Sequence, residues 1–161
     1  MKIDIFTDGA CSPNPGVGGY GIILSFKDKN GKVHEREISG GFKDTTNNRM
    51  ELYSVIVAIE SVKTNNCELT IYSDSAYVVN AISKDWVTSW EKKKFQKKKN
   101  VDLWKRYLEL AKLHTIKTVW VKGHAGHPKN ERCDFLATSA IKRKDELFVD
   151  VGYEEIVKNN K

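Results

Sequence analysis

The chain has 161 residues, a length typical of one domain that can bury a hydrophobic core without disulfides or structural metals. Hydrophobic residues make up 40% of the sequence and charged residues 30%, which excludes a disordered chain and a membrane protein. The formal net charge is +6, which suits a polyanionic partner but also ordinary solubilising charge.

Three strands and a helix are expected in the first 63 residues. Strands are predicted at Ile3–Thr7, Tyr20–Phe26 and Val33–Phe42, where apolar runs are separated by glycine-containing turns. The segment Asn48–Lys63 then carries apolar residues around most of a helical surface, which predicts a largely buried helix. The order predicts a β-meander followed by a helix.

Helices alternate with strands in the rest of the chain. A fourth strand is predicted at Leu69–Ser73 and a short helix after Asp74, and Asn100 is expected to cap an amphipathic helix that ends near His114. A fifth strand is predicted at Ile116–Lys122. This order of elements predicts an α/β fold with a mixed sheet covered by helices.

The last helix is expected to begin near Asn130, and the segment from Asp145 is expected to be loosely held. Because no Pro/Gly-rich linker divides the chain, we expect one domain over residues 1–153 and a flexible tail over 154–161. Three widely spaced cysteines favour reduced thiols over disulfides or a zinc site. With no secretory signal or long apolar run in the sequence, we expect a cytoplasmic protein.

Positive charge is concentrated between Lys84 and Arg106. This basic segment holds nine basic residues against three acids, so the remainder of the chain is neutral. Trp86, Trp90 and Phe95 lie among its lysines, and aromatic rings beside cations suit a sugar-phosphate backbone. The basic segment therefore predicts a nucleic-acid-binding surface. The alternative is a solvated basic helix whose aromatic residues only dock it on the core.

Two acidic residues follow predicted strands. Asp8 comes directly after Ile3–Thr7 and Asp74 directly after Leu69–Ser73, and open α/β sheets bind ligands beyond the carboxyl ends of their strands. Two central strands that deliver carboxylates to one edge would suit a cation. Taken singly, Asp8 could instead be a turn aspartate before Gly9, and Asp74 could be a helix N-cap.

Three more acidic residues have both a functional and a structural interpretation. Glu51 lies three residues after Asn48, which is the spacing of a capping box, and taken alone it favours a cap. Asp134 flanks the apolar stripe of the last helix, and Glu131 lies on the same face. These two acids would repel each other unless a cation lay nearby, although neighbouring basic side chains could also reduce this repulsion.

The loop before the last helix, VKGHAGHPKNE, contains two glycines and two histidines. His124 could move protons near neutral pH. Since the other candidate residues are carboxylates, the pattern favours a hard cation such as Mg²⁺ over zinc. We therefore assign His124 to proton transfer or product release.

Five ordered motifs resemble those of type 1 ribonuclease H in its bacterial-like form. The resemblance extends from Lys2 to about Tyr153. The motifs are TDGACSPNPGVGGYG (7–21), TTNNRMEL (45–52), YSDSAYV (72–78), NVDLW (100–104) and VKGHAGHPKNERCD (121–134). The resemblance implies an RNase H-like fold, with a five-stranded mixed sheet and helices on both faces.

The resemblance also implies an endonuclease that hydrolyses the RNA strand of RNA–DNA hybrids, largely independently of base sequence, and leaves 5′-phosphate and 3′-hydroxyl ends. It implies two-metal-ion catalysis with Mg²⁺, for which Mn²⁺ could substitute. The metal ligands that it implies are Asp8, Glu51, Asp74 and Asp134. His124 and Glu131 are similar to auxiliary residues that aid proton movement and product escape.

Substrate-binding residues follow from the same resemblance. The RNA strand, read through its 2′-hydroxyls, would be bound by Cys11, Asn14, Asn47 and Asn48. The DNA strand would be bound by Thr46, Asn100, Trp86, Trp90, Lys92, Lys93, Lys94, Lys97, Lys98 and Lys99. The basic protrusion, about 84–100, is shorter than in bacterial relatives, and Asp44 stands where relatives often carry an arginine near the DNA-phosphate pocket.

Two other classes of protein fit the sequence less well. A catalytically silent hybrid-binding module disagrees with the intact carboxylate set, and a DNA nuclease or recombinase of the same broad fold would usually carry extra DNA-binding domains. The sequence is also compatible with the nuclease domain of a larger polymerase. We expect a monomer that binds RNA–DNA hybrid and no membrane, while the sequence identifies no replication or repair partner.

Overall fold

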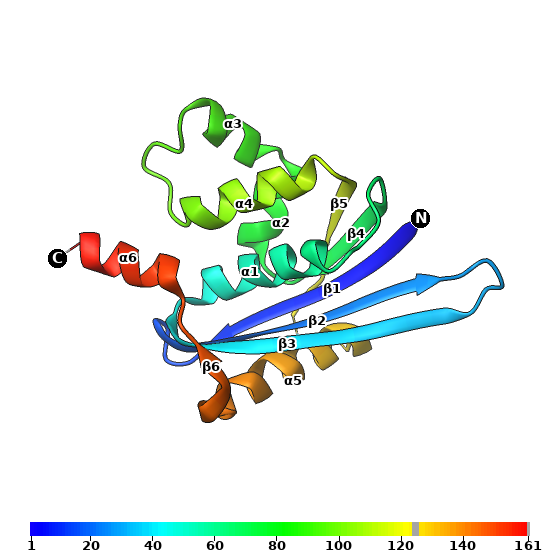
Figure 1. Cartoon of the computed structure of the whole chain (residues 1–161), viewed down its shortest axis with the longest axis horizontal. Coiled ribbons are helices and arrows are strands. Elements are labelled where there is room, and N and C mark those ends of the chain that lie inside the picture. Colours follow the sequence, from blue (N-terminus) through cyan, green and yellow to red (C-terminus); the bar gives the residue numbers. More distant parts are fainter. Residues whose placement is uncertain (124–125, 161) are drawn as a thin grey trace.

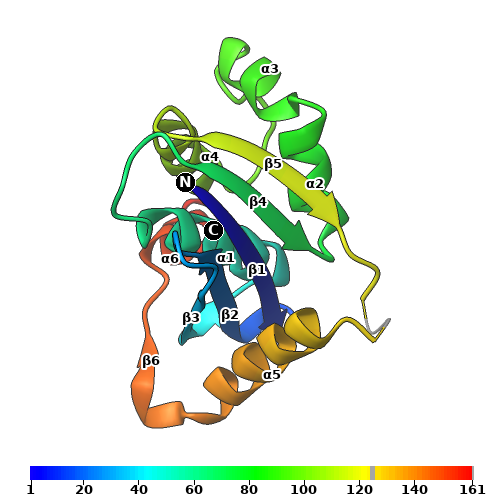
Figure 2. The ribbon, with the colours of Figure 1, turned by 90° about the vertical axis from the view of Figure 1, so that its right-hand side faces the viewer.

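The apolar runs of the sequence form one mixed sheet with helices on both faces (Figures 1 and 2). The computed structural model describes residues 1–123 and 126–160. Strands β1, β2 and β3 form an antiparallel meander, and β4 and β5 continue the sheet in parallel with β1. In sheet order, the strands are β5 (Thr115–Trp120), β4 (Glu68–Ser73), β1 (Lys2–Cys11), β2 (Gly16–Lys27), β3 (Val33–Thr45) and β6 (Leu147–Phe148).

The α/β class and the helices on both faces are confirmed, but the expected count of five strands is wrong. The sixth strand, β6, pairs in parallel with β3 at Gly41 and Phe42. Because β6 has only two residues, an alternating pattern cannot reveal it in the sequence.

The helices form two unequal layers. Figure 2 shows α5 alone on one side of the sheet, whereas α1 and α4 lie on the other. The helices are α1 (Asn47–Glu60), α2 (Ala76–Ser83), α3 (Trp86–Lys92), α4 (Val101–Ala111), α5 (Pro128–Lys142), the 3-10 turn η1 (Lys144–Glu146) and α6 (Val151–Asn159). None of the helices in the described ranges is long and apolar enough to cross a membrane.

The main core lies between the sheet and α1, with α4 packed outside α1. The prediction of a largely buried helix is confirmed by α1, where Leu52, Val55 and Ile56 are fully buried. Trp104 of α4 is also fully buried against this layer. A smaller cluster under α5 includes Cys133.

Glycines allow both helix layers to touch the backbone of the sheet. A Cβ atom added to Gly9 of β1 would lie 2.5 Å from the backbone nitrogen of Glu51 in α1. On β2, a Cβ atom at Gly21 would overlap the backbone oxygen of Cys133 in α5, and one at Gly19 would overlap that of Ala137. The acidic residues on α1 and α5 are therefore held close to the central strands.

The segment from Asp145 differs from the loosely held tail that we expected. It forms η1, β6 and α6, and Asp150 is buried where it accepts hydrogen bonds from Thr45 and Arg49. The partners lie about a hundred residues apart in the sequence, so local patterns cannot predict this anchor.

We predict that Gly21→Ala lowers the free energy of unfolding by about 1–3 kcal/mol, because a methyl group would force α5 away from β2. Urea unfolding measures the change. The control is Gly31→Asn, in an open turn where φ is +80°, which asparagine tolerates and where an added Cβ meets no atom within 4 Å. Equal stability of Gly21→Ala and wild type would contradict the close-packing argument.

Candidate active site

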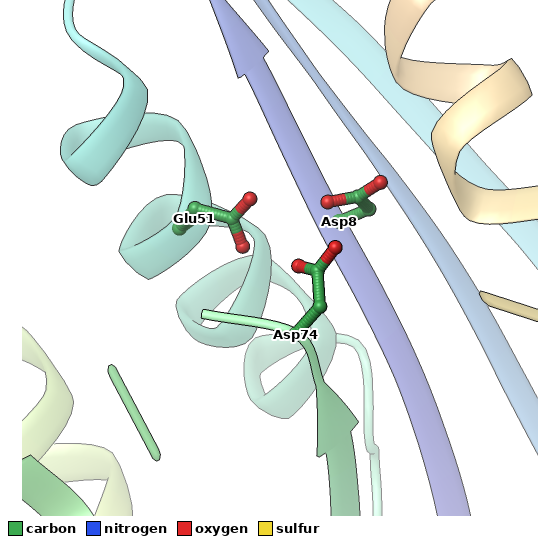
Figure 3. Close-up of side chains that lie close together, drawn as sticks. All are labelled: Asp8, Glu51 and Asp74. Carbon is green, nitrogen blue, oxygen red and sulfur yellow. The ribbon is translucent and has the colours of Figure 1, made fainter. Parts of the chain in front are cut away.

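Three carboxylates converge where β1, α1 and the end of β4 meet (Figure 3). Asp8 lies in β1, Glu51 in α1, and Asp74 directly after β4. One oxygen from each carboxylate lies within 4.8 Å of the others. Asp8 and Glu51 are each only 4% exposed. We call these three residues the carboxylate cluster.

The structure removes the local alternatives for all three residues. Asp8 lies inside β1, where it pairs with Gly21 of β2, so it is not in a turn. The N-cap of α1 is Thr46, so Glu51 lies beyond the first turn and closes no capping box. The N-cap of α2 is Ser75, so Asp74 does not cap that helix. No role at a turn or helix end accounts for this clustering.

The backbone of Gly9 connects two members of the cluster. Its N–H donates to Oδ1 of Asp8 at 2.9 Å and to Oε1 of Glu51 at 3.1 Å. The second oxygen of Glu51, Oε2, is buried and accepts no hydrogen bond within the described part of the chain. A buried carboxylate oxygen without a donor is costly, so this atom suits a cation ligand.

Burial and repulsion between like charges raise the pKa values of Asp8 and Glu51. Burial, followed by the charge of Asp74, raises the pKa of Asp8 to about 8. Burial, followed by the charges of Asp8 and Asp74, raises the pKa of Glu51 well above its usual range. A divalent cation would relieve this repulsion, and an all-oxygen ligand set fits a hard cation.

The other predicted catalytic residues do not all join the cluster. Asp134, in α5, is half-buried and raises the pKa of Asp8 through its charge, but it lies outside the set of three convergent carboxylates. Glu131 is exposed in the first turn of α5. The prediction for His124 falls outside the described residues. Gly123, just before it, packs against Asp74, where an added Cβ would lie 3.1 Å from Oδ2.

Half of the predicted strand-binding residues meet in one groove of about 780 Å³, which we call the large groove. Asn14, Asn47 and Asn48 from the RNA-strand set line it together with Thr46 and Asn100 from the DNA-strand set. Lys98 and Lys99 also line this groove. Cys11 is not among the lining residues, and its half-buried thiol donates to nearby backbone oxygens, including that of Pro13 at 3.2 Å.

Asn100 occupies the N-cap position of α4, but its side chain does not cap the helix. Its amide nitrogen instead donates to the hydroxyl of Tyr77 at 3.1 Å, and its oxygen accepts from Arg49. The positioning roles of Tyr77 and Arg49 could not be predicted from the sequence, because both depend on contacts with distant segments. Arg49 is part of the motif TTNNRMEL, but nothing in this motif indicates that the arginine is buried.

The basic segment has both an anchor and an accessible face. Phe95 is buried in the core, as the docking alternative requires, whereas Trp86 is 42% exposed. Trp86 and Trp90 line a second groove of about 430 Å³ with Lys97, Lys98 and Lys99. The ammonium group of Lys98 lies 4.9 Å from the ring centroid of Trp90. The lysines at 92–94 line neither groove.

Comparisons with known proteins identify the family of this chain. Residues 1–142 match the family model described as RNase H. The chain is 55% identical to the Ribonuclease H of Lachnoclostridium phytofermentans, over 87% of this chain and 92% of the relative. It is 54% identical to the Ribonuclease HI of Helicobacter pylori, over 85% and 91%. The fold is similar to the crystal structure of LC9-RNase H1, a type 1 RNase H with the type 2 active-site motif, with a TM-score of 0.82 at 30% identity over 96% of this chain and 79% of that chain.

We predict that the metal-free protein loses stability as pH rises from about 4 to about 8. The unfolded chain releases the Asp8 proton near its ordinary pKa of 3.8, whereas the folded chain keeps it to about pH 8. Folding therefore takes up a proton in this range, and Asp8→Asn should weaken the pH dependence. Urea unfolding in EDTA between pH 5 and pH 9 measures both effects.

The control for this experiment is Asp4→Asn, which changes an exposed aspartate on the same strand. It should retain the pH dependence of the wild type. If Asp8→Asn and wild type show the same slope of stability against pH, the repulsion attributed to the cluster is wrong.

Proposed function

The chain belongs to the ribonuclease H family, and we propose that the carboxylate cluster, together with Asp134, forms the active site with which it cleaves the RNA strand of RNA–DNA hybrids. The observation that carries this proposal is the convergence of three acidic side chains from β1, α1 and β4 without a local structural reason. A cluster of this kind is expensive unless a cation compensates for it.

The cluster has the chemistry to hold magnesium. Bound there with substrate, two Mg²⁺ ions, or Mn²⁺ in their place, would supply the positive charge that activates water and stabilises the leaving 3′ oxygen. Asp8 and Glu51 would bind through oxygens whose orientation is fixed by the N–H of Gly9. Asp134 would complete the ligand set from α5, and the products would carry 5′-phosphate and 3′-hydroxyl ends.

We assign the remaining catalytic roles to residues at the start of α5 and just before it. Glu131 is exposed in the first turn of α5, which suits a role in product release. His124 would move protons near neutral pH, as its position in the sequence predicts. These assignments follow the family resemblance, and the packing of Gly123 against Asp74 supports them by placing the start of this loop beside the cluster.

The large groove suits a hybrid that is read without regard to base sequence. Asn14, Asn47 and Asn48 present amides that could bind 2′-hydroxyls, and the same contacts would be made along any RNA sequence. Cys11 would contribute to the RNA side mainly through its backbone. Thr46 and Asn100 would bind a DNA phosphate, with lysines adding non-specific attraction. We further propose that the enzyme acts as a monomer in the cytoplasm.

We predict that Asp8→Asn lowers hybrid cleavage in Mg²⁺ by at least about 100-fold, equal to about 2.7 kcal/mol of transition-state stabilisation. The assay uses end-labelled hybrid, duplex DNA, duplex RNA and single strands, each with Mg²⁺ or EDTA. Asp4→Asn is the matched control, since it removes an exposed carboxylate from the same strand and should leave the rate unchanged. Hybrid binding by wild type without Mg²⁺-dependent RNA cleavage would support the silent binding module instead.

The two lysine triplets allow a charge-matched test of substrate binding. Replacing Lys97–Lys99 with alanine should weaken hybrid binding more than the same change at Lys92–Lys94, because only the first triplet lines the grooves. Each lost phosphate contact should also reduce the slope of log affinity against log salt by about 0.9. Equal losses for the two variants would show that net charge, and not groove position, determines affinity.

A further inference from the structure

The large groove has a second wall that the family motifs do not include. We call the side of the groove with Asn14, Asn47 and Asn48 the first wall, and the second wall consists of Gly152, Tyr153, Glu155, Ile156 and Asn159, all in α6. Figure 1 shows α6 beyond the amino-terminal ends of α1 and α4, the helices that bring Asn47, Asn48 and Val101 to the groove. Two parts of the chain that are distant in sequence thus enclose one space.

An ion cluster around the buried Arg49 fixes α6 in this place. Arg49 donates to Asp150 through Nε at 2.8 Å and Nη2 at 3.0 Å, and to Asp102 through Nη1 at 2.9 Å and Nη2 at 2.7 Å. Asp150 also accepts from Thr45 at 2.7 Å and caps α6 through the N–H of Tyr153. One arginine therefore joins α1, α4 and the residue that begins α6.

Gly152 allows α6 to pack closely against Arg49 and Asp102. A Cβ atom at this position would lie 2.5 Å from Nη2 of Arg49 and would overlap Oδ2 of Asp102. The backbone of α6 therefore lies directly on the ion cluster. Because the same cluster holds α4 beside α1, the two walls of the groove are fixed relative to each other.

Tyr153 and Glu155 give the second wall its chemistry. Burial, followed by the charges of Asp44 and Cys11, raises the pKa of Tyr153, which agrees with a position beside the ends of β1 and β3. Glu155 is exposed and forms no ion pair among residues 1–123 and 126–160. An uncompensated carboxylate in a groove lined by Lys98 and Lys99 opposes the binding of phosphate.

We propose that α6 is part of the hybrid-binding surface, in which Tyr153 contacts the nucleic-acid backbone and Glu155 weakens its binding. This inference rests on the proposed function, because the occupant of the large groove is taken to be the hybrid. Lysines and uncharged amides line the groove, which suits a polyanionic occupant. Two of these amides belong to Asn47 and Asn48 at the start of α1, the helix that also carries Glu51. The two residues act on binding and not on the chemical step.

The test compares two neutralising variants of α6. Glu155→Gln should lower the Kd for a short hybrid by at least about twofold at 0.1 M salt, and the gain should fall as salt rises. Glu154→Gln makes the same charge change at an exposed residue that does not line the groove, so its effect should be smaller. Equal effects of the two variants would overturn the role of Glu155.

Tyr153→Ala should raise the Kd and KM by at least about threefold while kcat at saturating hybrid stays within about twofold, since an aromatic contact to nucleic acid is lost. Thermal unfolding of the variant shows whether α6 is still in place, and Tyr153→Phe should retain most of the affinity. Unchanged Kd in a folded Tyr153→Ala variant overturns the inference. Failure of the proposed function can be distinguished from failure of this inference, because in the first case the wild type itself would not cleave hybrid in Mg²⁺.

Discussion

Direct contact between helix backbone and sheet backbone is the constraint on which the rest of this structure depends. Gly9 allows α1 to lie against β1, and Gly19 and Gly21 allow α5 to lie against β2 from the other face. Side chains at these positions would hold the helices away from the strands. The closeness has a direct chemical result, because the Gly9 N–H reaches the carboxylates of both Asp8 and Glu51.

This close packing has an electrostatic cost. It places carboxylates in a poorly solvated site where burial and like charge both favour protonation, and the pKa values of Asp8 and Glu51 are raised accordingly. A protein selected only for stability would place apolar or paired side chains here. The proposed function accounts for the cluster, because a cation needs ligands that are already assembled, and assembly in advance avoids reorganisation during binding.

Local sequence patterns predicted most helices and strands, but not the contacts between segments that are distant in the sequence. Strand and helix positions followed from apolar periodicity, and the strand-end position of Asp74 pointed to the site. Glu51 was harder, because its spacing from Asn48 matched a capping box, whereas the observed cap is Thr46, two residues before Asn48. Arg49, β6 and α6 escaped prediction because their placement depends on ion pairs and strand pairing between distant segments.

The charges around the large groove are arranged unequally, and this affects how a hybrid would settle in it. Lys98 and Lys99 approach from the basic segment, whereas Glu155 lies on α6. At physiological salt, charges interact over about 8 Å, so each side of the groove acts mainly on the phosphates nearest to it. A hybrid in this groove would therefore be attracted more strongly toward the basic segment than toward α6, where Glu155 weakens the binding that Tyr153 supports, while the uncharged amides would contribute geometry.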